Sequence, residues 1–310
     1  MKIVIALGGN AILQPGEKGT AAEQFRNVKL TCCHIADVVK NGHQVLITHG
    51  NGPQVGNILI QNKLSAGVTP AMPLSICGAQ SQGMIGYMIQ QAIMNEYNTL
   101  SVKKHVVSII TQTLVDERDV AFRNPTKPIG PFYSESEAQT LRSKGIAVKE
   151  DSGRGWRMVV PSPSPVEVLE KESIKTLIEK GFTVIAVGGG GIPVVRDRIG
   201  NLQGTRAVID KDLGSQRIAN DIGADTLAIL TGVEKVSLNF NKSNQVDLNC
   251  VSVQEISRYY REGHFGEGSM APKIEAAIRF IEEGGEQVII TSLEKLSLAL
   301  AGHAGTIITK

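Results

Sequence analysis

Three glycine-rich stretches each follow a short apolar run in this 310-residue sequence. They read ALGGNAI from residue 6, THGNGPQVG from residue 48 and AVGGGGIPVV from residue 186. Glycine leaves main-chain N–H groups uncovered, and a helix that begins after such a loop adds a dipole that favours anions. Each loop alone could equally be a tight turn. Three loops in one chain favour a site for an anion such as phosphate.

Three lysines could supply the matching positive charge. Lys211 in AVIDKDL and Lys273 in SMAPKIEAAIRF each fall in the first turn of an expected helix, where the dipole disfavours a cation unless an anion is bound. Lys127 lies in NPTKPIGP, where flanking prolines stiffen the backbone. Any one of them alone could be a solvated surface lysine. Asp210, directly before Lys211, could orient the lysines, help to place Mg²⁺ or cap the helix.

Phosphoryl transfer is the chemistry that needs such charge and N–H donors more than a strong nucleophile. Gly50, Gly52 and Gly56 are spaced one residue too far apart for the dinucleotide fingerprint, and the P-loop and protein-kinase motifs do not occur. His49 could contact a ligand or anchor its loop. The other histidines and the four cysteines show no metal-ligand spacing, and the cysteines suit a reduced, cytoplasmic protein.

Bulk composition excludes other classes of function. The net charge is +2 and no run of like charges occurs, so no nucleic-acid partner is expected. No apolar run is long enough to span a bilayer, so no membrane partner is expected either.

Apolar runs alternate with amphipathic stretches along the chain, which predicts an α/β domain with a mostly parallel sheet between helices. Strands are predicted at 2–7, 44–48, 105–111, 183–187, 206–210, 226–231, 287–291 and 305–309, and helices at 22–40, 80–97, 166–180, 212–222 and 272–283. In such a sheet the glycine loops would meet at the carboxyl ends of the strands. Residues 116–165 break the pattern. They are polar and hold Trp156 and half of the twelve prolines, so we expect a small subdomain or lid there.

The ordered set of motifs strongly resembles the carbamate kinases of the amino-acid kinase superfamily over nearly the whole chain. Besides the glycine loops, it includes SQGMIGYMIQQ, NPTKPIGPFY, EDSGRGWRMVVPSP, AVIDKDL and GSMAPKIEAA. The resemblance implies one three-layer domain over residues 1–310 with about eight strands and an inserted lid at 116–165. It also implies reversible phosphoryl transfer between ATP and carbamate, running catabolically from carbamoyl phosphate and ADP in arginine, agmatine or ureide breakdown. Mg²⁺ on the nucleotide phosphates, without protein ligands, and a homodimer are further implications.

The same resemblance assigns the site. Lys127, Lys211 and Lys273 would stabilise the transferring charge, with Asp210 orienting them. Carbamate or carbamoyl phosphate would contact Gly8, Gly9, Asn10, Gly50, Asn51, Gly52, Gly188, Gly189, Gly190 and Gly191. The nucleotide would contact Lys211, Thr231, Gly232, Val233, Met270 and Lys273.

The sequence departs from the family pattern on the nucleotide side. Gly232 stands where Asp is usual, Ser237 stands where Tyr is frequent, and residues 214–220 read GSQRIAN where small apolar residues are usual. These changes leave open a non-catalytic regulatory paralogue and a kinase of another small carboxylate or carbamoyl compound.

Overall fold

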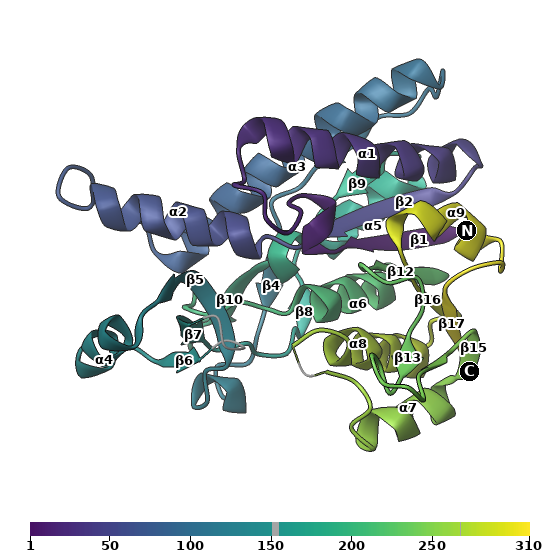
Figure 1. Ribbon diagram of the computed structural model, residues 1–310. Helices are drawn as coiled ribbons and strands as arrows, with labels where there is room; N and C mark the ends of the chain where they lie inside the picture. The colour runs from purple at the N-terminus through teal and green to yellow at the C-terminus, as the bar shows by residue number, and fades with distance from the viewer. Residues whose placement is uncertain (151–154, 267) are drawn as a thin grey trace.

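The computed structural model describes residues 1–150, 155–266 and 268–310, and Figure 1 shows a central sheet between two layers of helices. Within the described residues, eight strands form this sheet. From one edge to the other they are β15 (Cys250–Ser252), β17 (Thr306–Thr309), β16 (Gln287–Thr291), β12 (Thr226–Leu230), β1 (Lys2–Leu7), β2 (Gln44–His49), β9 (Thr183–Ile185) and β3 (Val106–Ser108). All neighbours pair in parallel except β16 and β17. The predicted α/β class and mostly parallel sheet are confirmed.

Helices cover both faces of the sheet, which is why its central strands are apolar without alternation. One face packs on α1 (Ala21–Lys40), α3 (Leu74–Thr99) and α9 (Leu296–Leu300). The other face packs on α5 (Lys171–Glu179), α6 (Lys211–Asp221), α7 (Val253–Arg261) and α8 (Ala271–Glu282). Strand residues alternate between the two cores: Ile3 and Ile5 join the first, and Val4 and Ala6 the second. Among the described residues, no helix is long and apolar enough to cross a membrane.

The region 116–165 builds a sheet of its own. Strands β5 (Lys127–Tyr133), β7 (Trp156–Val160) and β6 (Val148–Glu150) pair antiparallel in that order, and α4 (Glu135–Ser143) packs beside them. This sheet shares a small core with α2 (Gly52–Ser65), in which Ile129 and Val160 meet Val55. Figure 1 shows α2 and this sheet projecting together from one side of the molecule.

Short strands complete the chain. The strands β11 (Leu202–Gly204), β10 (Ile192–Arg196), β4 (Gln112–Leu114) and β8 (Glu167–Val168) pair in that order, and β13 (Ser237–Leu238) pairs with β14 (Val246–Asp247). Three short 3₁₀ turns bear on the site or its surroundings: η1 (Gly9–Ala11), η3 (Gly188–Gly190) and η4 (Leu293–Lys295).

Three predictions of elements were wrong in detail. Residues 206–210 form no strand, because the Val208 N–H donates to the carbonyl of Pro161 in a loop while Ala207 and Ile209 are buried. The predicted strand 105–111 splits, since β3 ends at Ser108 and β4 begins at Gln112 in a different sheet. The helix predicted at 166–180 begins only at Lys171, after the short strand β8.

The carboxyl ends of four adjacent strands bring the expected loops to one edge of the sheet. Leu7 at the end of β1 pairs in register with His49 at the end of β2, and β12 and β9 lie directly outside this pair. The first two glycine loops follow β1 and β2 directly, and the third follows β9. Thr231 and Gly232 follow β12.

Candidate active site

The first two glycine loops and Lys211 meet above the ends of β1 and β2. A Cβ atom placed on Gly50 would lie 3.8 Å from both the Gly9 nitrogen and Lys211 Cδ. Gly8 approaches the end of β12 so closely that its Cβ would lie 3.0 Å from the Leu230 carbonyl oxygen. Gly9 and Gly52 have open space where a side chain would stand. Bare main chain therefore faces the region in front of Lys211.

The helix α2 starts at this point without a side-chain cap. Its N-cap residue, Asn51, donates from Nδ2 to Ser81 Oγ over 2.8 Å and does not cap the helix, and the first turn contains no acidic residue. The first amide groups of a helix carry positive partial charge and need an acceptor. The start of α2 is thus suited to an anion.

The third glycine loop, which was predicted to contact substrate, is buried in the fold. All four glycines are buried, and added Cβ atoms would clash with His49 at Gly188, with Asn51 at Gly189, with Ile209 at Gly190 and with Thr113 at Gly191. The loop therefore supports the second loop from beneath. Direct contact of Gly188, Gly189, Gly190 or Gly191 with substrate stays a prediction.

His49 anchors this arrangement. Burial lowers the pKa of His49 to about 4, and the nearby charge of Lys211 acts in the same direction, so the ring is neutral at pH 7. Its Nδ1 lies 2.9 Å from the Gly50 carbonyl oxygen. Of the two roles considered from the sequence, anchoring the loop is the one that these contacts support.

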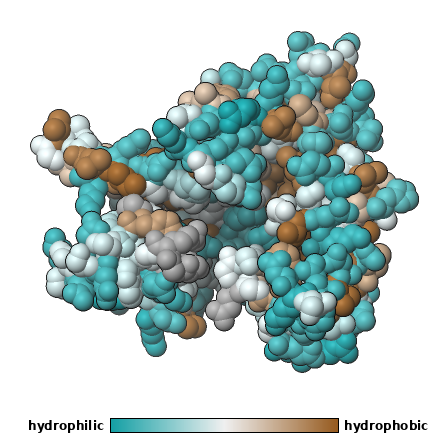
Figure 2. All heavy atoms as spheres, in the orientation of Figure 1, coloured by the Kyte–Doolittle hydropathy of each residue, from teal (hydrophilic) through white to brown (hydrophobic). Residues whose placement is uncertain are grey.

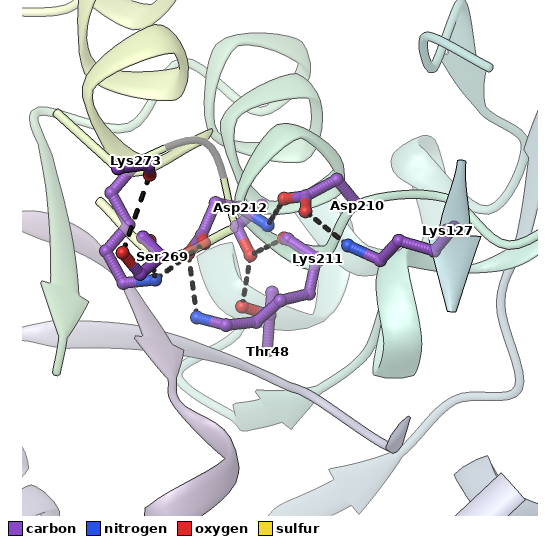
Figure 3. A network of polar contacts seen from close by, with 9 residues as sticks. Thr48, Lys127, Asp210, Lys211, Asp212, Ser269 and Lys273 are labelled. Carbon is purple, nitrogen blue, oxygen red and sulfur yellow. Dashed lines mark hydrogen bonds and ion pairs between the residues drawn. The ribbon is translucent and has the colours of Figure 1, made fainter. Parts of the chain in front are cut away.

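Lys211 and Lys273 converge on one carboxylate, that of Asp212 (Figure 3). Lys211 Nζ lies 2.7 Å from Asp212 Oδ1, and Lys273 Nζ lies 3.2 Å from Asp212 Oδ2 and 3.1 Å from the Ser269 carbonyl oxygen. Asp212 is only 3% exposed. Two ammonium groups around one buried carboxylate leave this cluster with one excess positive charge.

The pKa shifts reflect that imbalance. Burial opposes ionisation of Asp212, but the two ammonium groups hold the pKa of Asp212 below its ordinary value. Burial lowers the pKa of Lys211, and the like charge of Lys273 adds to this effect although Asp212 opposes it. An anion bound beside Lys211 would relieve the cost of its burial.

Asp210 contacts Lys127, one of the three lysines that it was predicted to orient. It caps α6 by accepting the Asp212 N–H at Oδ1 over 2.8 Å, and its Oδ2 lies 2.7 Å from Lys127 Nζ. Lys127 is brought here by β5, so this ion pair joins the projecting sheet to the start of α6. Lys211 and Lys273 pair with Asp212 instead. That Asp210 orients the lysines for phosphoryl transfer stays a prediction.

Asp212, which pairs with both Lys211 and Lys273, was not predicted as a site residue. A sign was available in the DKD triplet at 210–212, where a second carboxylate directly follows Lys211.

Two cavities adjoin at the lysine cluster. The larger, of about 750 Å³, is lined by Val233, Ser237, Phe240, His264, Met270 and neighbouring residues. The smaller, of about 460 Å³, is lined by Gly8, Gly9, Asn10, Lys211, Glu294 and neighbouring residues. Thr231, Gly232 and Lys273 line both. Every residue predicted to bind nucleotide lines at least one of these cavities. The aromatic lining residues Phe240, His264 and Phe265 were not predicted.

The departures from the family pattern differ in their relation to these cavities. Gly232 and Ser237 line the larger one. Of helix α6, only Lys211 lines either cavity. Within residues 214–220, Ser215 Oγ contacts Thr48 Oγ1 at 2.6 Å and Gln216 donates to Asn220, so these polar groups are satisfied inside the fold.

Protein groups offer little for a metal ion. Among the described residues, no three His, Cys, Asp or Glu side chains are gathered as metal ligands. The carboxylates of Asp210 and Asp212 are both engaged by lysines. A divalent cation here would have to be held chiefly by phosphate oxygens.

Comparison with known proteins agrees with this geometry. The model of the amino acid kinase family matches residues 1–292. The chain belongs to the amino acid kinase family. Among curated relatives of this amino acid kinase, the carbamate kinase of Pyrococcus horikoshii is 52% identical over 313 residues, 99% of each chain. The carbamate kinase of Pyrococcus furiosus is 52% identical over 309 residues, 98% of each chain.

Solved structures extend the likeness to three dimensions. A carbamate kinase from Giardia lamblia bound to AMP-PNP superposes on this amino acid kinase with a TM-score of 0.94. The two are 47% identical, and the match covers 100% of this chain and 98% of that one.

Proposed function

We infer that the protein is a carbamate kinase that transfers a phosphoryl group reversibly between ATP and carbamate. The observation that carries this inference is the Lys211–Asp212–Lys273 cluster, with its excess positive charge, at the junction of a large cavity and a glycine-lined one. The full-length identity of about half to carbamate kinases supports the same reaction.

The two cavities suit the two substrates. ADP occupies the larger cavity, which is the one with aromatic and apolar lining, and its phosphates extend past Thr231 to Lys273. The AMP-PNP in the Giardia relative, an ATP analogue, supports a nucleotide site in this fold. Carbamoyl phosphate lies in front of Gly8–Asn10 and the start of α2, where main-chain donors are bare.

The chemistry requires no covalent protein intermediate. A terminal oxygen of ADP attacks the phosphorus of carbamoyl phosphate, a new P–O bond forms, and the P–O bond to carbamate breaks with its electron pair leaving on carbamate. Lys211 and Lys273 stabilise the charge on the transferring group, and Asp212 holds both ammonium groups in place. Mg²⁺, bound to the nucleotide phosphates, would neutralise part of their charge.

Residues 116–165 are proposed to act as a lid within a single kinase domain that spans residues 1–310. The separate β5–β7–β6 sheet and the Lys127–Asp210 ion pair support this role. Lys127 would exchange Asp210 for the substrate anion, so that the lid contributes a third positive charge to the reacting group.

We also propose a homodimer formed through α3 and the adjacent edge strand β3. Residues 64–95 contain no Asp, Glu, Lys, Arg or His, although a fifth of the chain is charged. Tyr87, Met94 and Ile110 are 56%, 53% and 48% exposed around a hollow of about 490 Å³. A symmetric dimer places such a surface against its own copy, so an uncharged surface avoids like-charge repulsion. A cytoplasmic location, where ADP is available and thiols stay reduced, stays a prediction.

The reaction is tested by measuring ATP formed from ADP, Mg²⁺ and freshly prepared carbamoyl phosphate, with acetyl phosphate as the matched acyl phosphate and Lys211→Ala as the matched protein control. We expect ATP from carbamoyl phosphate with the wild-type protein only. Faster turnover of acetyl phosphate would make the protein a kinase of another carboxylate. ADP binding without ATP formation from either compound would make it a regulatory paralogue.

A further inference from the structure

Gly232 lies in the throat between the two cavities. The throat is formed by Thr231, Gly232 and Lys273, the residues that line both the 750 Å³ and the 460 Å³ cavity. A ligand that reaches from one cavity into the other has to pass these three residues. On the proposed function, that ligand is the phosphate chain of the nucleotide.

The backbone does not require glycine at this position. At Gly190 the φ angle is +86° and an added Cβ would lie 2.9 Å from Ile209, so the fold itself demands glycine there. Gly232 has no left-handed φ, and the nearest atom to its added Cβ would be Asn10 Nδ2, at the ordinary contact distance of 3.5 Å. A first side-chain carbon would fit. Any larger side chain would extend into the throat.

Charge at the throat points the same way. Lys273 is its charged side chain, and Lys211 lies next to it in the smaller cavity. A carboxylate at position 232 would face the phosphates that these lysines attract. Glycine thus leaves the throat both wider and more positive.

We propose that Gly232 is a specificity-determining residue that sets the affinity for nucleoside polyphosphates by keeping the throat open and free of negative charge. The proposal deepens the proposed function and rests on nucleotide binding in the larger cavity. It assigns to residue 232 control over the phosphate chain, separate from recognition of the nucleoside.

The test is a series of Gly232→Ala, Gly232→Val, Gly232→Asn and Gly232→Asp variants, each titrated calorimetrically with ADP and with adenosine. We expect the Gly232→Ala variant to bind ADP with an affinity within about twofold of wild type. The Gly232→Val variant should lose about tenfold or more in ADP affinity, as a misfitted methyl group causes in a tight site. Adenosine affinity should fall less than ADP affinity in the Val and Asp variants. The Gly232→Asp variant should bind ADP about fivefold more weakly than Gly232→Asn, because the two side chains are equally large and differ by one charge a few ångström from the phosphates.

Several results would overturn the proposal. One is a Val variant that binds ADP like wild type, and another is equal affinity of the Asp and Asn variants. An equal loss of adenosine and ADP affinity would also overturn it, because the substitution would then act on the whole pocket. Absence of ADP binding by the wild-type protein would instead refute the nucleotide site itself, and ADP binding without ATP formation would refute only the proposed reaction.

Discussion

At the scale of single residues, Asp212 holds the ammonium groups of Lys211 and Lys273 beside each other. Lys273 and Asp212 are 61 residues apart in the sequence and lie on different helices, α8 and α6. Their ion pair fixes the start of α8 against the start of α6. Since both lysines lie in first helical turns, the cluster also opposes the helix dipoles until an anion binds.

Removing either lysine should abolish most of the turnover. Lys211→Ala and Lys273→Ala each delete one charge from a preorganised phosphoryl site, which typically costs about 3 kcal/mol in the barrier, or more than a hundredfold in kcat. Steady-state rates beside circular dichroism spectra check this. A folded variant with nearly wild-type turnover would exclude that lysine from the mechanism.

Asp212→Asn should change how stability depends on pH. The folded-state pKa of Asp212 is held below its ordinary value near 3.8. The ionised carboxylate therefore adds to the free energy of unfolding above pH 3.8, and this contribution is lost as the pH falls through the lower folded-state pKa. The free energy of unfolding should therefore be higher for wild type than for Asp212→Asn at about pH 6, and the difference should shrink below about pH 4. Urea titrations across this range measure it. A constant difference would mean that the carboxylate is not what the lysines stabilise.

At the scale of elements, β5 carries Lys127 from the projecting sheet to the start of α6. The sheet packs on α2, which follows the second glycine loop, whereas Asp210 caps α6. Lys127 therefore links the projecting sheet and α2 to the start of α6.

Lys127→Ala should lower the turnover of carbamoyl phosphate, because the proposed lid would no longer bring its charge to the substrate. ADP affinity should stay within about twofold, because Lys127 does not line the larger cavity proposed for the nucleotide. Lys127→Arg should rescue poorly, since a longer planar guanidinium replaces a compact ammonium group. Calorimetry with ADP beside steady-state rates separates the two effects. Equal losses of ADP binding and turnover would contradict the division of the cleft between the halves.

Buried, apolar elements could be predicted from the sequence, and exposed or very short ones could not. The central strands and α1, α3, α6 and α8 were anticipated because two covered faces demand continuous apolar runs or a clear apolar stripe. The helix α2 was missed because only Gln54, Val55 and Gly56 of it are buried, so no stripe marks it. The edge strand β15 has three residues, too few for a pattern.

The site follows the same division. The loops after β1 and β2 and the lysines at helix starts could be predicted because the carboxyl ends of parallel strands converge. The role of the third loop could not, because a glycine required by a neighbouring side chain and one required by a ligand look alike in sequence. The pairing of Asp212 with both lysines depends on the angle between α6 and α8, which local patterns do not encode.

At the scale of the whole molecule, the uncharged face of α3 and the catalytic edge of the sheet are separate surfaces. Tyr87 and Met94 line neither of the two cavities at the lysine cluster. Figure 2 shows one face of the molecule, with hydrophilic residues prevailing over much of it and the apolar residues in smaller groups.

Met94→Lys combined with Tyr87→Lys should convert the proposed dimer to monomer, because four like charges would meet across a symmetric contact. Sedimentation or light scattering measures the mass. Ile199→Lys, at an 84% exposed site that does not line the hollow beside Tyr87 and Met94, is the matched control and should stay dimeric. A wild-type protein that is monomeric at every concentration tested would refute the dimer.

The excess charge around Asp212 implies a conflict between activity and durability. Two ammonium groups that share one buried carboxylate destabilise the folded state, and binding of an anionic substrate offsets this cost. Lys211→Met keeps the length of the side chain and removes that cost, so we expect an inactive protein whose Tm without ligand equals or exceeds that of wild type. Adding carbamoyl phosphate should raise the Tm of wild type more than that of this variant. The thermal stability of the protein would then be lowest when no substrate is bound, and its lifetime would depend on the concentration of carbamoyl phosphate.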